Sequence, residues 1–98
     1  MTRDEVQAWL DARHPAPPAA LRERLNRAVA ETTPHSPFPL YLADLGRELL
    51  ARVASRPAGG RELALDLLAA DAFVTYAFEA QAEDDVGGMA RLGEGAIL

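Results

Sequence analysis

Residues 61–84 read RELALDLLAADAFVTYAFEAQAED, and this stretch decides the fold. Leucine and alanine dominate it, and both residues favour helix, so one long helix is expected here. At about 100° per residue, its apolar side chains fall into two stripes on opposite sides of that helix. The first stripe contains Leu63, Leu67, Ala70, Val74, Ala77 and Phe78; the second contains Leu65, Ala69, Ala72, Phe73, Tyr76 and Ala80. A helix that is apolar on two sides needs cover on both of them.

Three shorter helices are expected before this one, over residues 3–13, 18–31 and 39–54, because prolines interrupt the chain between them. Thr2 and Glu5 stand three residues apart at the start of the first helix, which is the spacing of a capping box. The apolar residues of each helix recur at helical spacing, so each helix has one side to bury.

Glycines mark the two ends of the long helix in the sequence. Gly59-Gly60 closes the turn before residue 61, and Gly87-Gly88 is expected to end the helix near residue 84. A short glycine-containing tail, residues 87–98, would follow. We therefore predict an all-α protein: one compact, four-helix bundle-like domain over residues 1–98, with a long apolar C-terminal helix.

Composition excludes several classes of protein. The chain has 98 residues, a net charge of −5 and no cysteine, so disulfides, thiolate catalysis and cysteine-based zinc sites are ruled out. All ten cations are arginines; Arg22, Arg24 and Arg27 make the most basic segment, and we expect them to neutralise acidic neighbours rather than bind nucleic acid. No stretch resembles a secretory signal or a membrane span, so a bacterial-type cytoplasmic location is expected.

Candidate catalytic and metal-ligating residues are few. His14 and His35 lie beside prolines in expected loops, without the spacing of a metal site, and we interpret them as solvated. Neither Ser36 nor Ser55 lies in a nucleophile turn, and no phosphate-binding loop is present. The sequence therefore favours a protein that is not an enzyme; it leaves catalytic residues unassigned and predicts no cofactor or metal.

Asp71 is the carboxylate most in need of an explanation, because it lies beside the first apolar stripe. A buried lone carboxylate is costly unless it is paired. We expect an arginine from residues 18–31 or 39–54, or a nearby threonine or tyrosine, to bind it. An exposed position at the edge of the stripe and a role as a functional acid are the alternatives.

The leading functional hypothesis is a protein–protein interaction or structural module that forms a homodimer or binds another protein. If the three shorter helices cover only one side of the long helix, the second stripe stays exposed and requires a partner. The predicted interface residues are Leu65, Ala69, Ala72, Phe73, Tyr76 and Ala80.

Two alternatives come from other classes. A small-ligand sensor or enzyme would have a pocket between helices near Trp9, Tyr41, Asp71 and Tyr76, where aromatic rings and one carboxylate suit a small cation. An accessory subunit of a larger complex would instead use residues 96–98, Ala-Ile-Leu, as a docking peptide.

Overall fold

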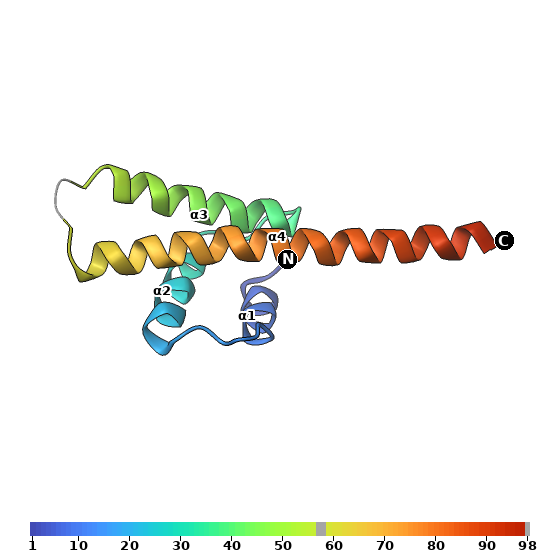
Figure 1. Ribbon diagram of the computed structural model, residues 1–98, viewed down its shortest axis with the longest axis horizontal. Coiled ribbons are helices and arrows are strands. Elements are labelled where there is room, and N and C mark those ends of the chain that lie inside the picture. The colour runs from blue at the N-terminus through green and yellow to red at the C-terminus, as the bar shows by residue number, and fades with distance from the viewer. Residues whose placement is uncertain (57–58, 98) are drawn as a thin grey trace.

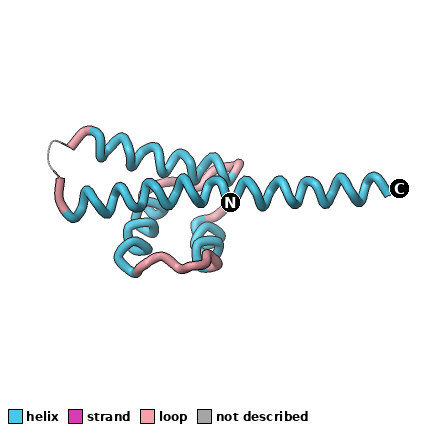
Figure 2. Tube along the Cα trace, viewed as in Figure 1, coloured by secondary structure: helices cyan, strands magenta, loops and turns pink. Residues whose placement is uncertain are grey.

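Four helices account for most of the computed structural model, which describes residues 1–56 and 59–97, with the backbone alone for residues 88–97. They are α1 (Arg3–Asp11), α2 (Ala19–Ala30), α3 (Phe38–Ala54) and α4 (Arg61–Ile97). The described residues contain no strand, so the predicted all-α class is confirmed (Figure 1, Figure 2). In Figure 1, α3 runs alongside the first half of α4, α1 and α2 pack below that half, and the rest of α4 projects beyond them. The molecule is accordingly elongated, with extents of 60 × 24 × 23 Å.

The predicted end of the long helix at Gly87-Gly88 is wrong, because α4 continues to Ile97. A glycine lowers helix propensity by about 1 kcal/mol but keeps its backbone donor, whereas a proline removes one. The sequence has no proline after residue 57, so nothing in this segment interrupts the backbone hydrogen bonds. The docking peptide expected at residues 96–98 lies outside the described part of the chain, because the structure describes neither the side chains of residues 96 and 97 nor any part of Leu98.

The start of α1 confirms the predicted capping box. The Thr2 hydroxyl accepts a hydrogen bond from the Glu5 amide at 3.1 Å, and the Glu5 carboxylate accepts one from the Thr2 amide at 3.1 Å. Both bonds satisfy backbone donors that a helix start leaves free. The helix ends at Asp11, two residues before the expected position, and α2 begins one residue after Pro18, which precedes it as the N-cap.

The core lies between α4 and the other three helices. Fully burying one large aliphatic or aromatic side chain stabilises the fold by about 1.5–3 kcal/mol, and every helix contributes at least one. The largest fully buried side chains are Tyr41, Phe73, Leu10, Leu25, Leu42, Val6 and Val29.

The pair formed by α3 and α4 is especially close, and Gly46 is the reason. A Cβ atom at position 46 would lie 3.0 Å from Cγ2 of Val74 and 3.1 Å from the carbonyl oxygen of Ala70. Glycine therefore lets the two backbones approach more closely than any other residue would allow. This contact places α3 over the Ala70 side of α4 and leaves the next sector of that helix uncovered.

Candidate functional site

The second apolar stripe of α4 faces the interior of the monomer. Ala69 and Phe73 have no exposed surface and Ala80 is 3% exposed, while Ala72 and Tyr76 are partly buried against the same core. Together with the half-buried Leu65, these are the residues predicted to form an interface between chains. The structure corrects that expectation, because the chain's own helices occupy the place of a partner. The alanines that would permit a close intermolecular contact permit a close intramolecular one instead.

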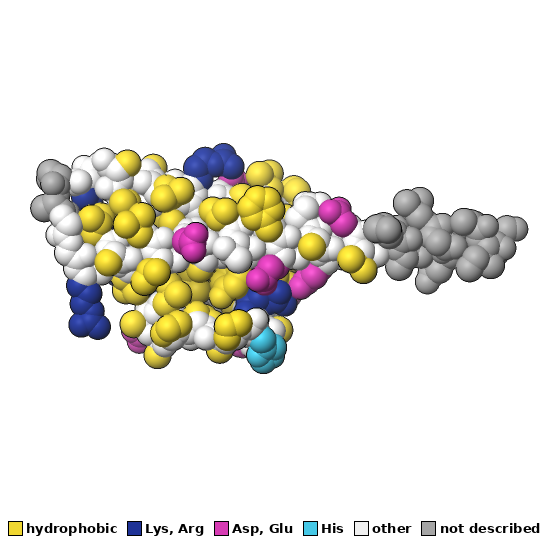
Figure 3. Space-filling view, viewed as in Figure 1, with side chains coloured by type: hydrophobic (Ala, Val, Ile, Leu, Met, Phe, Trp, Pro, Cys, Tyr) yellow, Lys and Arg dark blue, Asp and Glu magenta, His cyan; other side chains and the backbone are white. Residues whose placement is uncertain are grey.

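Three exposed apolar side chains of α4 lie together on the opposite sector. Leu67, Val74 and Phe78 are spaced by seven and four residues, so they share one side of the helix, and they are 46%, 36% and 74% exposed. Leu50 of α3 is 45% exposed and lies level with Leu67, because α3 and α4 run antiparallel and Gly46 meets Ala70 and Val74. We call Leu50, Leu67, Val74 and Phe78 the α3–α4 face. Figure 3 shows apolar side chains running over both helices on one side of the body, with an acidic side chain among them.

Asp71 and Asp66 exchange the roles expected from the sequence. Asp71 is exposed on the same side of α4 as Leu67 and Phe78, which is the edge position weighed as an alternative. Asp66 is the buried carboxylate, 4% exposed, and it is paired with Arg24 of α2 and with Arg56, at 2.8 Å, just after α3. An arginine partner for a buried carboxylate is therefore confirmed, but the carboxylate is Asp66 and not Asp71.

The described pockets do not bring Trp9, Tyr41, Asp71 and Tyr76 together, because only Tyr41 lines one of them. Trp9 and Tyr76 do meet, edge to face, with ring centroids 5.7 Å apart. However, the Trp9 ring is enclosed: it packs against Phe38, lies under the Arg13 guanidinium, and donates a hydrogen bond to Glu83 at 3.0 Å. Asp71 lies on the exposed sector of α4. These contacts of Trp9 hold α1 against α4.

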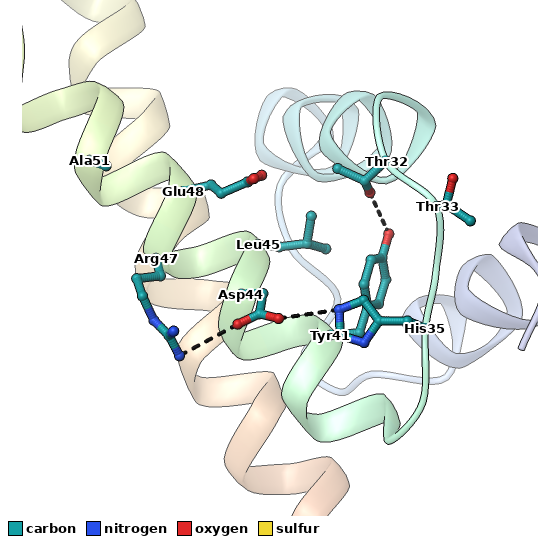
Figure 4. A pocket seen from close by; sticks show the side chains of 9 residues that line it. All are labelled: Thr32, Thr33, His35, Tyr41, Asp44, Leu45, Arg47, Glu48 and Ala51. Atoms are coloured by element: carbon teal, nitrogen blue, oxygen red, sulfur yellow. Dashed lines mark hydrogen bonds and ion pairs between the residues drawn. The ribbon is translucent and has the colours of Figure 1, made fainter.

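A pocket of about 490 Å³ does exist beside Tyr41, between the loop after α2 and one side of α3 (Figure 4). Its floor is apolar, formed by Leu45 and Ala51, and its rim carries Asp44 and Glu48, one helical turn apart. The remaining lining residues are Thr32, Thr33, His35, Tyr41 and Arg47.

Hydrogen bonds organise the polar side of this pocket. The Asp44 carboxylate contacts two side chains. Nε2 of His35 lies 3.2 Å from one of its oxygens, and Nη2 of Arg47 lies 3.5 Å from the other (Figure 4). The Tyr41 hydroxyl lies 2.7 Å from Oγ1 of Thr32. Burial raises the pKa of Tyr41, although the Thr32 hydrogen bond opposes the rise, so the phenol stays neutral at physiological pH. Neither His35 nor Asp44 was singled out as part of a pocket, since the sequence shows only a histidine in a proline-rich loop.

Two of the three arginines of α2, Arg22 and Arg24, pair with acidic side chains, as expected from the composition, whereas no such pair forms at Arg27 among the described residues. Arg22 pairs with Asp11 at 2.8 Å, and Arg24 pairs with Asp66. Arg24 is itself 5% exposed, so its pair with Asp66 is buried inside the protein. Burial alone would raise the pKa of Asp66, but the hydrogen bond and charge of Arg24, with a contribution from Arg56, outweigh it and lower that pKa.

Two structural features, a metal-binding cluster and a membrane-spanning helix, are absent from the described residues. No group of three or more histidine and carboxylate side chains lies close enough there to hold a metal ion. None of the described helices combines the length and apolar character required to cross a bilayer. The chain also matches no model of a known protein family, and neither the curated proteins nor the solved structures contain a significant match. The structure shows a small all-α protein in which an apolar face formed by α3 and α4 is exposed.

Proposed function

We propose that the protein is a protein–protein interaction module that self-associates through the α3–α4 face. The observation that supports this proposal is the row formed by Leu67, Val74 and Phe78, with Phe78 74% exposed. The four side chains of the face expose on the order of 400 Å², which is the size of a functional patch on a monomer. A standard interface buries about 800 Å² per partner, so the remainder would come from residues that flank this face on α3 and α4.

Charge distribution favours a second copy as the occupant of this face. Arg61 begins α4 and Arg56 lies just after α3, whereas Asp84 and Asp85 lie further along α4, beyond Glu79 and Glu83, which already pair with Arg13 of the same chain. When two α4 helices lie antiparallel, each basic end meets the acidic segment of the other copy. A register that places Arg61 opposite Asp84 also places Leu67 opposite Phe78, because Leu67 is six residues after Arg61 and Phe78 is six residues before Asp84. The Leu67–Phe78 and Arg61–Asp84 contacts are therefore compatible in one arrangement, which also places Asp71 opposite Val74 of the other copy and sets one charge against the apolar contact.

Light scattering behind a sizing column tests this proposal. The parent protein is expected to elute as a dimer at micromolar concentration, and Leu67→Gln combined with Phe78→Gln is expected to elute as a monomer with unchanged helicity. Leu68→Gln is the matched control, because Leu68 is 56% exposed and adjacent in sequence but points about 100° away from Leu67. A monomeric parent protein, or a double variant that remains dimeric, would rule out this interface.

A second candidate function is the binding of a small organic amine in the Tyr41 pocket. Its volume of about 490 Å³ is within the usual range of ligand pockets, and it combines an apolar floor with the carboxylates Asp44 and Glu48. An ammonium group would lie between the carboxylates and its apolar body over Leu45.

Benzylamine is a suitable probe for this pocket, with amide shifts followed by NMR. We expect saturable shifts at Thr33, His35 and Glu48, and Glu48→Gln is expected to weaken binding several-fold because it removes one carboxylate. Glu23→Gln, an exposed carboxylate of α2, is the control. Equal affinities in Glu48→Gln and Glu23→Gln would refute this assignment.

A further inference from the structure

A second, smaller pocket lies at the end of the body where α3 leads towards α4. It measures about 140 Å³ and gathers Arg24 and Arg27 of α2 with Arg52 of α3 and Arg56 just after it. Four of the chain's ten arginines thus surround one small space in a protein whose net charge is −5. The other lining residues are Glu31, Glu62, Leu65 and Asp66, so the four arginines exceed the three carboxylates by one charge.

Arg24 has a hydrogen-bonding group without an acceptor at this place. Its Nε donates to Asp66, whereas its Nη1 is buried and meets no hydrogen-bond partner among the described residues. Arg24 is 5% exposed, so bulk water does not solvate this N–H group. A buried cation whose hydrogen bonds are incomplete favours a negative charge close to it, and an anion in the pocket would supply that charge.

Two of the three carboxylates around the pocket, Asp66 and Glu31, are already engaged in ion pairs. Asp66 accepts from Arg24 and from Arg56, and Glu31 lies 3.5 Å from Nη1 of Arg52. Each of these arginines has further N–H groups, because a guanidinium carries five donors. The first turn of α4 also borders the pocket through Glu62 and Leu65, and the N-terminus of a helix attracts negative charge.

We propose that this pocket binds a small tetrahedral oxyanion such as inorganic phosphate. The anion would accept from the guanidinium groups of Arg27 and Arg52, and the buried charge of Arg24 in the pocket wall would attract it. A volume of about 140 Å³ accommodates such an ion, whereas pockets for larger organic ligands usually exceed 300 Å³. The pocket does not include the α3–α4 face, so this inference goes beyond the proposed function and is independent of it.

Calorimetric titration with inorganic phosphate tests the site, with sodium chloride at the same ionic strength as the reference. We expect saturable binding of one phosphate per chain. Arg27→Gln is expected to weaken binding about tenfold, because it removes one charge-assisted donor, while Glu62→Gln tightens binding several-fold, because it removes a repulsive carboxylate. Arg27 and Glu62 are both exposed, so the two variants should keep the fold, which circular dichroism checks.

Arg47→Gln is the matched control, since Arg47 is an exposed arginine of α3 outside this pocket, and it should bind phosphate like the parent. O-phosphoserine carries the same phosphate group on a larger body, and it is expected to bind about tenfold more weakly if the pocket takes the free ion. Equal affinity for O-phosphoserine would overturn the assignment to a free ion. The absence of saturable binding, or equal affinities in Arg27→Gln and Arg47→Gln, would overturn the site itself.

Discussion

Asp66→Asn is the substitution that most directly tests how α4 is held to the rest of the fold. Asp66 is 4% exposed and accepts bonds from Arg24 of α2 and from Arg56 after α3, so one carboxylate ties three parts of the chain together. Asparagine keeps the shape of the side chain and removes its charge. The Arg24 side chain, 6% exposed, then becomes a buried cation without a counter-charge. Breaking a buried pair from one side in this way costs about 3–5 kcal/mol.

This cost is large compared with the stability of a chain of this size. Proteins of 98 residues unfold with roughly 5–15 kcal/mol, so the substitution removes about a third to a half of the stability in the middle of that range. For a domain of this length each kcal/mol lowers Tm by about 4–8 °C, and a fall of at least about 12 °C is therefore expected.

Thermal and urea unfolding followed by circular dichroism measure the effect, in a buffer without phosphate. Asp71→Asn is the matched control, because it makes the same chemical change five residues along the same helix at an exposed position. It is expected to change stability by no more than about 0.5 kcal/mol. Equal losses in Asp66→Asn and Asp71→Asn would refute the view that the buried pair stabilises the fold.

Two further predictions concern pH and the α3–α4 contact. Because the folded state lowers the pKa of Asp66, its contribution is complete above the ordinary carboxyl pKa of about 3.9 and is lost as the pH falls through the folded-state pKa. Urea midpoints measured from pH 7 to pH 3 should therefore fall less steeply in Asp66→Asn than in the parent, and parallel curves would contradict this. Gly46→Ala gains about 1 kcal/mol of helix propensity but loses about 1–3 kcal/mol by overpacking against Val74 and the Ala70 carbonyl, so a net loss is expected. Gly59→Ala, where the new Cβ would meet only Leu63 at 3.6 Å, is its control, and a Tm in Gly46→Ala above that of the parent would contradict the prediction.

The candidate sites show where prediction from sequence stopped. The sequence pattern predicts that Asp71 needs a partner, because it lies beside Leu67 and Phe78. In the structure, Arg24 pairs with Asp66 instead. The helical period places each carboxylate on a side of α4, but it contains no information on where α2 crosses that helix. His35 and Asp44 lie nine residues apart and meet only because the loop after α2 folds back onto α3.

Local patterns were sufficient for the properties that depend on near neighbours in the chain. The helical class, the capping box at Thr2 and the two apolar sides of α4 all follow from residue type and spacing over a few turns. Only the packing of the helices decided which of those two sides is buried. The apolar pattern shows which side chains need burial, but it does not show which helix packs against them. Gly46 settles that choice by letting α3 lie against Ala70 and Phe73, so that Phe73 is buried while Phe78 stays exposed.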